Sequence, residues 1–391
     1  MIEELRNPRH SSRITLSQRA LATNLRFLRS KIGEGPILSS VVKANAYGHG
    51  IEAFVPMAER AGVRHFAVAS SHEALKVLAA RREPGRIMIM GILYPEDLPW
   101  VIQRDLDFFV FDIGRLHGAL RVARQLGRPA RVHLEVETGG NRNGLTAGPF
   151  DEALRLIRDH PSELSFEGLA THFAGIESLA NRFRIVRQQQ RFAAFEQRTH
   201  AAGVHPKLRH VACSAAALAF PETVMDMVRI GTAQYGFWPS PDVYNVHLMQ
   251  TGKEHDNPLK RVLTWKTDVM DLKDVSAGDF VGYGTAYQAS RDMVVAVLPV
   301  GYSDGYPRAL SNRGHVLVRG RKAPIVGLVN MNVTMVDVTD VPAVDVGDEV
   351  VLVGRQKHQA ISVASFSEVS SALNNEFVSR LPAAIPRVAV P

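Results

Sequence analysis

The sequence is poor in cysteine and has no long hydrophobic segment. Cys213 is the only cysteine among 391 residues, so no disulfide can form within the chain, and the composition fits a reducing compartment. Residues 1–20 carry several charged groups and no continuous apolar stretch, and no later segment is apolar over a bilayer-spanning length. These absences predict a cytoplasmic protein with neither a secretion signal nor a membrane span.

Metal-binding spacings and a basic nucleic-acid surface are also lacking. The 15 histidines show no paired spacing with cysteines or carboxylates of the kind that metal sites use. The net charge is +7, but Lys and Arg are scattered in short groups such as Arg81, Arg82 and Arg86. No basic helix or aromatic-basic platform emerges. We therefore expect neither a metal site nor binding to nucleic acid.

The chain does contain a regular alternation of strand-like and helix-like segments between residues 37 and 231. The expected strands are Ile37–Val42, His65–Ala69, Arg86–Met90, Leu106–Phe111, Ala130–Val136, Phe166–Ala170, Leu208–Ala212 and Met225–Ile230. The helical stretches between them include Ser71–Arg81, Pro95–Arg104, Arg115–Leu126, Phe150–Asp159 and Asn181–Ala202. Eight βα units over about 200 residues predict a TIM (β/α)8 barrel.

The pattern changes after residues 238–241. From about Leu263 onward, short β-branched runs alternate with glycine turns, which predicts a mainly-β domain. Its expected strands include Leu263–Met270, Met293–Leu298, Val316–Arg319, Ile325–Val329, Met335–Val338 and Glu349–Val353. We therefore expect an α/β protein with an N-terminal barrel domain over residues 12–245 and a C-terminal mainly-β domain over residues 246–391. Residues 1–11 are a candidate partner of the second domain.

Lys43 follows the first expected strand, within the segment Val-Val-Lys-Ala-Asn-Ala-Tyr-Gly-His-Gly at residues 41–50. A glycine-punctuated turn comes next, and helical apolar spacing then runs from Ile51 to Gly62. A lysine at the end of a parallel strand opens into the active-site mouth of an α/β fold. Partial desolvation there favours the neutral amine that condenses with a carbonyl to form a Schiff base. The alternative, from position alone, is a surface lysine.

Polar residues follow other expected strands as well. Arg142 follows the fifth strand, His172 the sixth and Ser214 the seventh, while Arg229 and Gly231 close the eighth. Because the carboxyl ends of barrel strands meet at one face, these residues should converge. The Ser214 hydroxyl and the Gly231 amide are candidates for a phosphate site. A role for Ser214 as the N-cap of the next helix is an alternative that is compatible with phosphate binding.

The octet Lys-Ala-Asn-Ala-Tyr-Gly-His-Gly, from Lys43 to Gly50, resembles the pyridoxal-phosphate attachment motif of alanine racemases. The resemblance covers nearly the whole chain, because further family motifs follow in the expected order. It implies pyridoxal 5′-phosphate as the cofactor, Lys43 as its anchor and Tyr47 at its phosphate end. His172, in Thr-His-Phe-Ala, resembles the histidine beside the cofactor ring, although a buried structural histidine is the alternative. Arg229, in Val-Arg-Ile-Gly, resembles the arginine that faces the pyridine nitrogen and keeps it unprotonated.

Racemisation removes a proton from one face of the α-carbon and returns one to the other, so it needs two bases. Lys43 would serve one face. Tyr283, in Val-Gly-Tyr-Gly-Thr-Ala-Tyr at residues 281–287, resembles the second base of the family. Outside this context the segment is typical of an ordinary glycine turn. In the family this tyrosine reaches the barrel of the neighbouring subunit, so the resemblance implies a homodimer with shared active sites.

The resemblance also suggests substrate-binding residues. Tyr302 lies in Gly-Tyr-Ser-Asp-Gly at residues 301–305, and the family's corresponding tyrosine narrows the substrate pocket. Met331 corresponds to a methionine near the substrate carboxylate. Arg142, in Thr-Gly-Gly-Asn-Arg-Asn-Gly, is the candidate to bind that carboxylate and to tune Tyr283, because a tyrosine pKa of about 10 is too high for a base at neutral pH. A surface-loop role is the alternative for Arg142.

Three positions depart from the family pattern. Many relatives have a lysine at position 135 that becomes carbamylated and orients the arginine corresponding to Arg142. This chain has Glu135, and we hypothesise that its carboxylate supplies the anion directly. The family's Met-Asp pair is Met331-Asn332 here, which removes a negative charge near the substrate. Asn375 replaces a phosphate-binding tyrosine and offers a hydrogen bond with a shorter reach.

The resemblance implies a racemase that interconverts L- and D-alanine and supplies D-alanine for peptidoglycan. A broad-specificity or non-alanine amino-acid racemase is the nearest alternative, favoured by Asn332 and Asn375 and disfavoured by the lack of a secretion signal. A barrel-fold decarboxylase usually supplies a cysteine from its β domain, whereas Cys213 lies in the expected barrel. A single-barrel cofactor carrier would not need the second domain. Substrate range, dimer affinity and physiological direction stay open.

Overall fold

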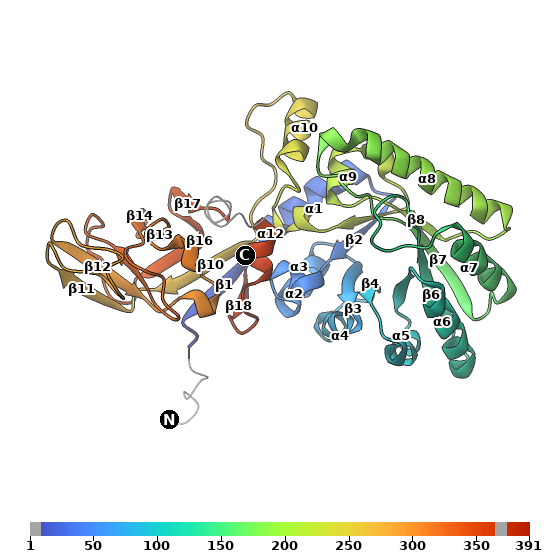
Figure 1. Ribbon diagram of the computed structural model, residues 1–391, viewed down its shortest axis with the longest axis horizontal. Helices are drawn as coiled ribbons and strands as arrows, with labels where there is room; N and C mark the ends of the chain where they lie inside the picture. The colour runs from blue at the N-terminus through green and yellow to red at the C-terminus, as the bar shows by residue number, and fades with distance from the viewer. Residues whose placement is uncertain (1–8, 364–373) are drawn as a thin grey trace. The chain divides into compact units, whose positions relative to one another are not determined.

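The computed structural model describes residues 9–363 and 374–391 (Figure 1). Its internal contacts divide the chain into two compact units. The barrel unit comprises Ala20–Ala44 and Val55–Lys260. The second unit comprises Asn45–Phe54 together with the described residues up to Arg19 and from Arg261 onward.

The barrel unit contains eight parallel strands in the order β8-β7-β6-β5-β4-β3-β2-β9. They are β2 (Ile37–Val41), β3 (His65–Ser70), β4 (Arg86–Ile92), β5 (Asp107–Val110), β6 (Ala130–Glu135), β7 (Leu164–Ala170), β8 (Leu208–His210) and β9 (Met227–Ile230). The ends of the sheet approach closure, because Arg229 N–H donates to the Ala212 carbonyl over 3.0 Å and Asp226 N–H to the Arg209 carbonyl over 3.1 Å. The predicted TIM barrel is confirmed.

Helices follow the strands and lie outside them (Figure 1). They are α1 (Gln18–Ile32), α3 (Ile51–Arg60), α4 (Ser71–Ala80), α5 (Leu98–Gln103), α6 (Ile113–Leu126), α7 (Ala147–Asp159), α8 (Arg182–Ala201), α9 (Ser214–Ala219) and α10 (Pro241–Thr251). The short apolar strands are buried on both faces, as all four residues of β5 are, because parallel strands pack between the barrel interior and the helices.

Charged residues close the amino-terminal ends of the barrel strands. Asp107 at the start of β5 contacts Arg86 over 2.5 Å and Arg131 over 2.8 Å. Arg131 also reaches Glu167 over 2.6 Å. Asp107 and Glu167 are both buried, so these pairs satisfy carboxylates that would otherwise be costly to bury. In TIM barrels the active site lies at the opposite, carboxyl-terminal ends of the strands.

The second unit is mainly β. Its larger sheet has the order β14-β13-β16-β10-β1-β18, with β17 paired to β16, and a smaller sheet has the order β11-β12-β15. The strands are β1 (Ser12–Ser17), β10 (Leu263–Asp268), β11 (Asp271–Val275), β12 (Met293–Leu298), β13 (His315–Val318), β14 (Arg321–Pro324), β15 (Thr334–Asp337), β16 (Glu349–Gln356), β17 (Gln359–Ile361) and β18 (Arg387–Val390). The predicted mainly-β character is confirmed.

One expected strand of this unit is wrong. Residues Ile325–Val329 were expected to extend, but the strand ends at Pro324, and Ile325 makes only an isolated bridge with Val336. Gly327 turns the chain with a φ of +77°, and the apolar side chains of Ile325 and Val329 are buried without being part of a strand. The apolar pattern therefore indicated correctly that these residues are buried, but the prediction of a β-strand was wrong.

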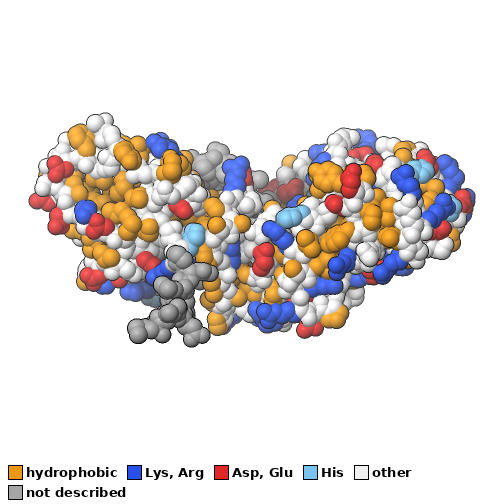
Figure 2. Space-filling view, turned by 90° about the horizontal axis from the view of Figure 1, so that it is seen from below, with side chains coloured by type: hydrophobic (Ala, Val, Ile, Leu, Met, Phe, Trp, Pro, Cys, Tyr) orange, Lys and Arg blue, Asp and Glu red, His pale blue; other side chains and the backbone are white. Residues whose placement is uncertain are grey.

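No helix among the described residues is long and apolar enough to cross a membrane. Figure 2 shows Lys and Arg side chains interspersed with Asp and Glu side chains over the face that it displays, with apolar side chains between them.

Candidate active site

Lys43 begins α2 (Lys43–Tyr47), which is a left-handed helical turn. The φ angles of Ala44, Asn45, Ala46 and Tyr47 are 52°, 52°, 54° and 51°. A left-handed backbone costs a non-glycine residue about 1–2 kcal/mol, so the surrounding structure must hold it. Part of that support is local, because the Asn45 carboxamide oxygen accepts the Ile51 N–H over 3.0 Å. The expected glycine-punctuated turn follows directly, because Gly48 and Gly50 have φ angles of +78° and +84°.

The strand end before Lys43 is held by buried hydrogen bonds. The carbonyl of Val41 accepts the Tyr235 hydroxyl over 2.9 Å and the Gln234 carboxamide over 3.0 Å. Much of the Lys43 side chain is exposed, yet burial of its amine lowers its pKa, and the charge of Arg142 lowers it further. Glu73 opposes these effects, while Arg229 adds to them. The environment therefore makes this amine easier to deprotonate than that of an ordinary lysine.

Arg229, in β9, is the most firmly held cation of the site. Its guanidinium donates to the carbonyls of Thr171 and His210, both over 2.7 Å, and to Nδ1 of the His210 ring over 2.6 Å. Because a guanidinium only donates, His210 accepts at Nδ1 and carries its proton on Nε2, which lies 2.9 Å from Nδ1 of His133. This Arg229–His210–His133 chain was not expected from the sequence. Its signal in the sequence was one histidine in each of two barrel strands, His133 in β6 and His210 in β8.

His172 follows β7 and is neutral at ordinary pH. Burial, followed by the charges of Arg229, Arg142 and Lys43, lowers its pKa to about 3. A neutral imidazole can lie beside an aromatic ring without adding to the positive charge already there.

Ser214 and Gly231 lie together after β8 and β9. The Gly231 N–H donates to the Ser214 hydroxyl oxygen over 2.9 Å, and both residues are buried. Ser214 is the first residue of α9, and Cys213 holds the N-cap position, so the alternative role of Ser214 as an N-cap is wrong. The Gly231 amide hydrogen is taken by Ser214 in this arrangement, and the Ser214 hydroxyl keeps its own hydrogen to donate to an anionic group.

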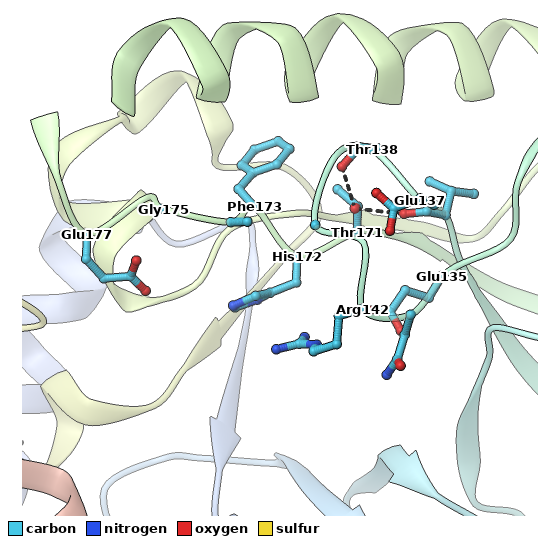
Figure 3. Close-up of a pocket in the computed structure, with 13 residues that line it drawn as sticks. Glu135, Glu137, Thr138, Arg142, Thr171, His172, Phe173, Gly175 and Glu177 are labelled. Atoms are coloured by element: carbon cyan, nitrogen blue, oxygen red, sulfur yellow. Dashed lines mark hydrogen bonds between the residues drawn. The ribbon is translucent and has the colours of Figure 1, made fainter. Parts of the chain in front are cut away.

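Arg142 projects from the loop between β6 and α7 (Figure 3). This loop and the loop after β7 enclose a pocket of about 240 Å³. The residues that line the pocket are Glu135, Val136, Glu137, Thr138, Gly140, Arg142, Asn143, Thr171, His172, Phe173, Ala174, Gly175 and Glu177. In Figure 3 the His172 and Arg142 side chains both extend from these loops, which is consistent with the effect of the Arg142 charge on the pKa of His172.

Glu135 ends β6 with its side chain buried, and its Oε2 atom has no hydrogen-bond partner among the described residues. Burial raises the pKa of this carboxyl, while the charges of Arg229 and Arg142 oppose the shift. Among the described residues, no hydrogen bond or ion pair joins Glu135 to Arg142. Arg142 therefore acts on Glu135 through its charge, without a direct contact between the two side chains.

The expected residues of the second unit lie on exposed loops. Tyr283 is 72% exposed, Met331 is 56% exposed and Tyr302 is 41% exposed. Two of these loops interlock, because Tyr302 N–H donates to the Asn330 carbonyl and Ser303 N–H to the Met331 carbonyl, both over 2.9 Å.

A glycine is required where these loops meet. A Cβ atom at Gly301 would lie 2.2 Å from the Asn330 oxygen. Asn332 also ties the loops, since its carboxamide donates to the Ser303 hydroxyl over 2.7 Å. These contacts hold the loop that carries Tyr302 against the loop that carries Met331.

Two expected cofactor-binding residues lie elsewhere in the second unit. Tyr47 ends α2, and the backbone of Asn375 lies in α12 (Asn374–Ser379). The side chain of Asn375 lies outside the described residues. Over the described residues, no group of three His, Cys, Asp or Glu side chains is arranged to hold a metal ion.

Two family models match the chain. The model of the alanine racemase N-terminal domain matches residues 16–239, and that of the alanine racemase C-terminal domain matches residues 262–389. The alanine racemase of Symbiobacterium thermophilum is 39% identical over 371 residues, which cover 94% of each chain. That of Sorangium cellulosum is 37% identical over 380 residues, covering 94% of this chain and 96% of the relative.

Solved structures agree with these matches. The alanine racemase from Streptomyces lavendulae has a TM-score of 0.87 and 31% identity, with 98% of both chains covered. The alanine racemase from Bartonella henselae, which carries covalently bound pyridoxal phosphate, has a TM-score of 0.81 and 25% identity, with 98% of this chain and 100% of that chain covered.

Proposed function

We propose a two-base mechanism for this chain, which belongs to the alanine racemase family and therefore interconverts L-alanine and D-alanine. The chain is thus an isomerase that acts on a small amino acid. The observation that carries the mechanism is the convergence of Lys43, whose pKa is lowered, with Arg142, His172 and Arg229 at the carboxyl ends of the barrel strands.

Pyridoxal 5′-phosphate is the proposed cofactor, and the barrel site fits it. Ser214 and Gly231 offer converging polar groups for the phosphate, and the amine of Lys43 is suited to hold the cofactor covalently. Arg229 would face the ring nitrogen and His172 the ring. Tyr47 and Asn375 are further phosphate-binding candidates, by family correspondence alone. When bound, the cofactor supplies an electron sink that makes the α-hydrogen of the amino acid acidic.

Lys43 and Tyr283 are the two proposed bases. The lowered pKa of Lys43 leaves more of its amine neutral, so Nζ can take a proton from one face of the α-carbon. The Tyr283 hydroxyl would deliver a proton to the opposite face, and the roles exchange in the reverse reaction. Arg229 donates all of its observed hydrogen bonds to fixed acceptors, so it holds its position and charge while these protons move.

Arg142 is the proposed partner of the substrate carboxylate, because its guanidinium lies in the pocket beside His172. Tyr302 and Met331 are proposed to bound the substrate site from an interlocked pair of loops. A broad-specificity racemase is a second candidate, because Asn332 bonds to Ser303 and supplies no negative charge next to Met331.

The proposed assembly is a homodimer in which Tyr283 completes the site of the partner. Its support is the exposure of Tyr283, Tyr302 and Met331, since large apolar and aromatic side chains gathered on exposed loops are typical of interfaces. We further propose a cytoplasmic enzyme that supplies D-alanine for peptidoglycan.

A chiral assay of the purified protein with single-enantiomer alanine, beside a panel of other amino acids, tests the function. Racemisation of alanine far above that of the panel supports the leading proposal. Comparable turnover of several amino acids would favour the broad-specificity enzyme instead, and turnover to decarboxylated products alone would refute both.

Mixed dimers test the shared site. Lys43→Ala and Tyr283→Phe subunits, each inactive alone, would regain about a quarter of the wild-type activity after random mixing, because half the dimers then hold one intact site of two. No recovery, with mixed dimers shown to form, would place both residues in the same subunit's site.

A further inference from the structure

One face of α8 contacts both loops that enclose the Arg142 pocket, and α8 crosses above them in Figure 3. Arg184, Gln188 and Arg191 are separated by four and three residues, so they project from the same side of the helix. We call these three side chains the α8 brace. Each donates to a backbone carbonyl of one of the two loops.

Gln188 fixes the loop that follows β7. Its carboxamide oxygen accepts the Ala174 N–H over 2.8 Å, and its nitrogen donates to the Ala174 carbonyl over 3.0 Å. Gln188 is only 1% exposed, and its nitrogen also donates to the Arg184 carbonyl over 3.3 Å, so these bonds satisfy a buried amide. Ala174 is two residues beyond His172, so the pairing restrains the backbone that presents the His172 ring.

Arg184 and Arg191 fix the loop that carries Arg142. Arg191 donates to the Thr138 carbonyl over 3.2 Å, and Arg184 donates to the Gly139 carbonyl over 3.0 Å. Gly139 has a φ of +136°, and a Cβ atom there would lie 3.2 Å from Cγ of Gln188 and 3.3 Å from Nη1 of Arg191. A side chain at position 139 would therefore press against Gln188 and Arg191.

The same loop is held from within by Glu137. Its carboxylate accepts the N–H groups of Gly139 and Asn141, the latter over 2.8 Å. The amides of this turn thus bond to Glu137, while the carbonyls bond to α8. Nearer the strand ends the two loops are joined to each other, because the hydroxyls of Thr138 and Thr171 lie 2.9 Å apart.

We propose that the α8 brace sets the separation between the Arg142 loop and the His172 loop, and so positions Arg142 for the substrate carboxylate. Gln188, Arg184 and Arg191 are positioning residues in this scheme, since each acts through backbone that it holds. The inference rests on the proposed function, because it assumes that Arg142 binds the substrate. A displacement of about 1 Å in such a group is enough to cost up to about a hundredfold in rate.

The test replaces Gln188 by methionine, which keeps the length of the side chain and removes both hydrogen bonds to Ala174, together with the one to the Arg184 carbonyl. Gln190→Met is the matched control, because Gln190 is exposed on the same helix and lines neither loop. Arg191→Met is a second variant at an exposed position, chosen to leave the buried packing of the helix intact.

Steady-state racemisation and amide hydrogen exchange are measured on the cofactor-loaded dimer of each variant. In Gln188→Met we expect KM for alanine to rise about tenfold with a smaller change in kcat, and cofactor absorbance to be unchanged. Exchange at Gly139, Asn141 and Ala174 should become faster. Arg191→Met should show the same changes, confined to Gly139 and Asn141, and Gln190→Met should match the wild type.

Faster exchange without any rise in KM would make the brace a structural support only and would overturn the inference. So would unchanged exchange and unchanged KM in both Gln188→Met and Arg191→Met. Failure of the wild-type protein to racemise alanine would instead refute the proposed function, so the two failures are distinguishable.

Discussion

The barrel residues and the second-unit residues of the proposed site differ in how firmly the chain holds them. Arg229 is 4% exposed and donates to three backbone carbonyls, and Ser214 is 3% exposed and bonded to Gly231. Tyr283 and Met331 are 72% and 56% exposed. The barrel thus buries the Arg229 and Ser214 side chains, whereas the second unit exposes the Tyr283 and Met331 side chains, as is common at interfaces.

Substitution of Lys43, in the barrel unit, should cause the greatest loss of racemisation. Lys43→Ala should reduce racemisation by about 10⁴-fold or more, because it removes both a base and the covalent anchor of the cofactor. Borohydride reduction followed by peptide mass spectrometry should place the cofactor on Lys43 in the wild type. Covalent cofactor on another lysine would refute the assignment of Lys43 as the cofactor anchor. Lys76→Ala, an alternative lysine in α4, serves as the control.

Tyr283→Phe tests the role of the exposed residues of the second unit. We expect kcat to fall about 10²–10⁴-fold with covalent cofactor retained, because only one proton donor is lost. Exchange of the α-hydrogen with deuterated solvent should be impaired more for one enantiomer than for the other, since Lys43 still serves its own face. Tyr287→Phe is the matched control in the same loop. Equal loss for both enantiomers would contradict the division of the two faces between the two residues.

The buried histidines of the barrel should make its stability sensitive to acid. Burial lowers the pKa of His65 to about 4, so the folded state resists a proton that the unfolded chain accepts below a pH of about 6.5. The stabilisation is complete above that pH and is lost as the pH falls towards 4, by on the order of 2 kcal/mol. Chemical unfolding of wild type and His65→Gln at pH 7 and pH 4.5 measures it. A His65→Gln variant with the same pH dependence as the wild type would show that other groups dominate.

Glu135→Gln should have the smallest effect. If the charge of Glu135 supports Arg142, the substitution should raise KM for alanine about tenfold. Because burial raises the pKa of Glu135, the wild-type KM should fall as the pH rises and the carboxyl ionises, and the variant should lack this dependence. Glu152→Gln, which alters an exposed ion pair with His117, is the control. Identical KM profiles in the wild type and Glu135→Gln would end the hypothesis that Glu135 is the anion for Arg142.

Much of the fold could be predicted from local pattern. Each of the eight expected barrel strands overlaps an observed one, because short runs of β-branched and apolar residues between helical stretches have few other stable arrangements. In the second unit, residues 325–329 are buried but do not form the expected strand. Strand β14 at Arg321–Pro324 was not predicted, because it begins with an arginine and a lysine, and charged residues at a sheet edge do not give the apolar pattern of a strand.

The barrel, the mainly-β unit and the lysine octet shared with the family could all be predicted from the chain alone, because they depend on periodicity and on residues adjacent in the chain. The way in which the site is held depends on contacts between distant residues. In the left-handed turn at residues 44–47 only Asn45 is of a type that visits this conformation readily, so contacts around the turn help to impose its shape. The Arg229–His210 bond and the α8 brace join residues far apart in sequence, whose distances depend on how the strands close and where α8 packs.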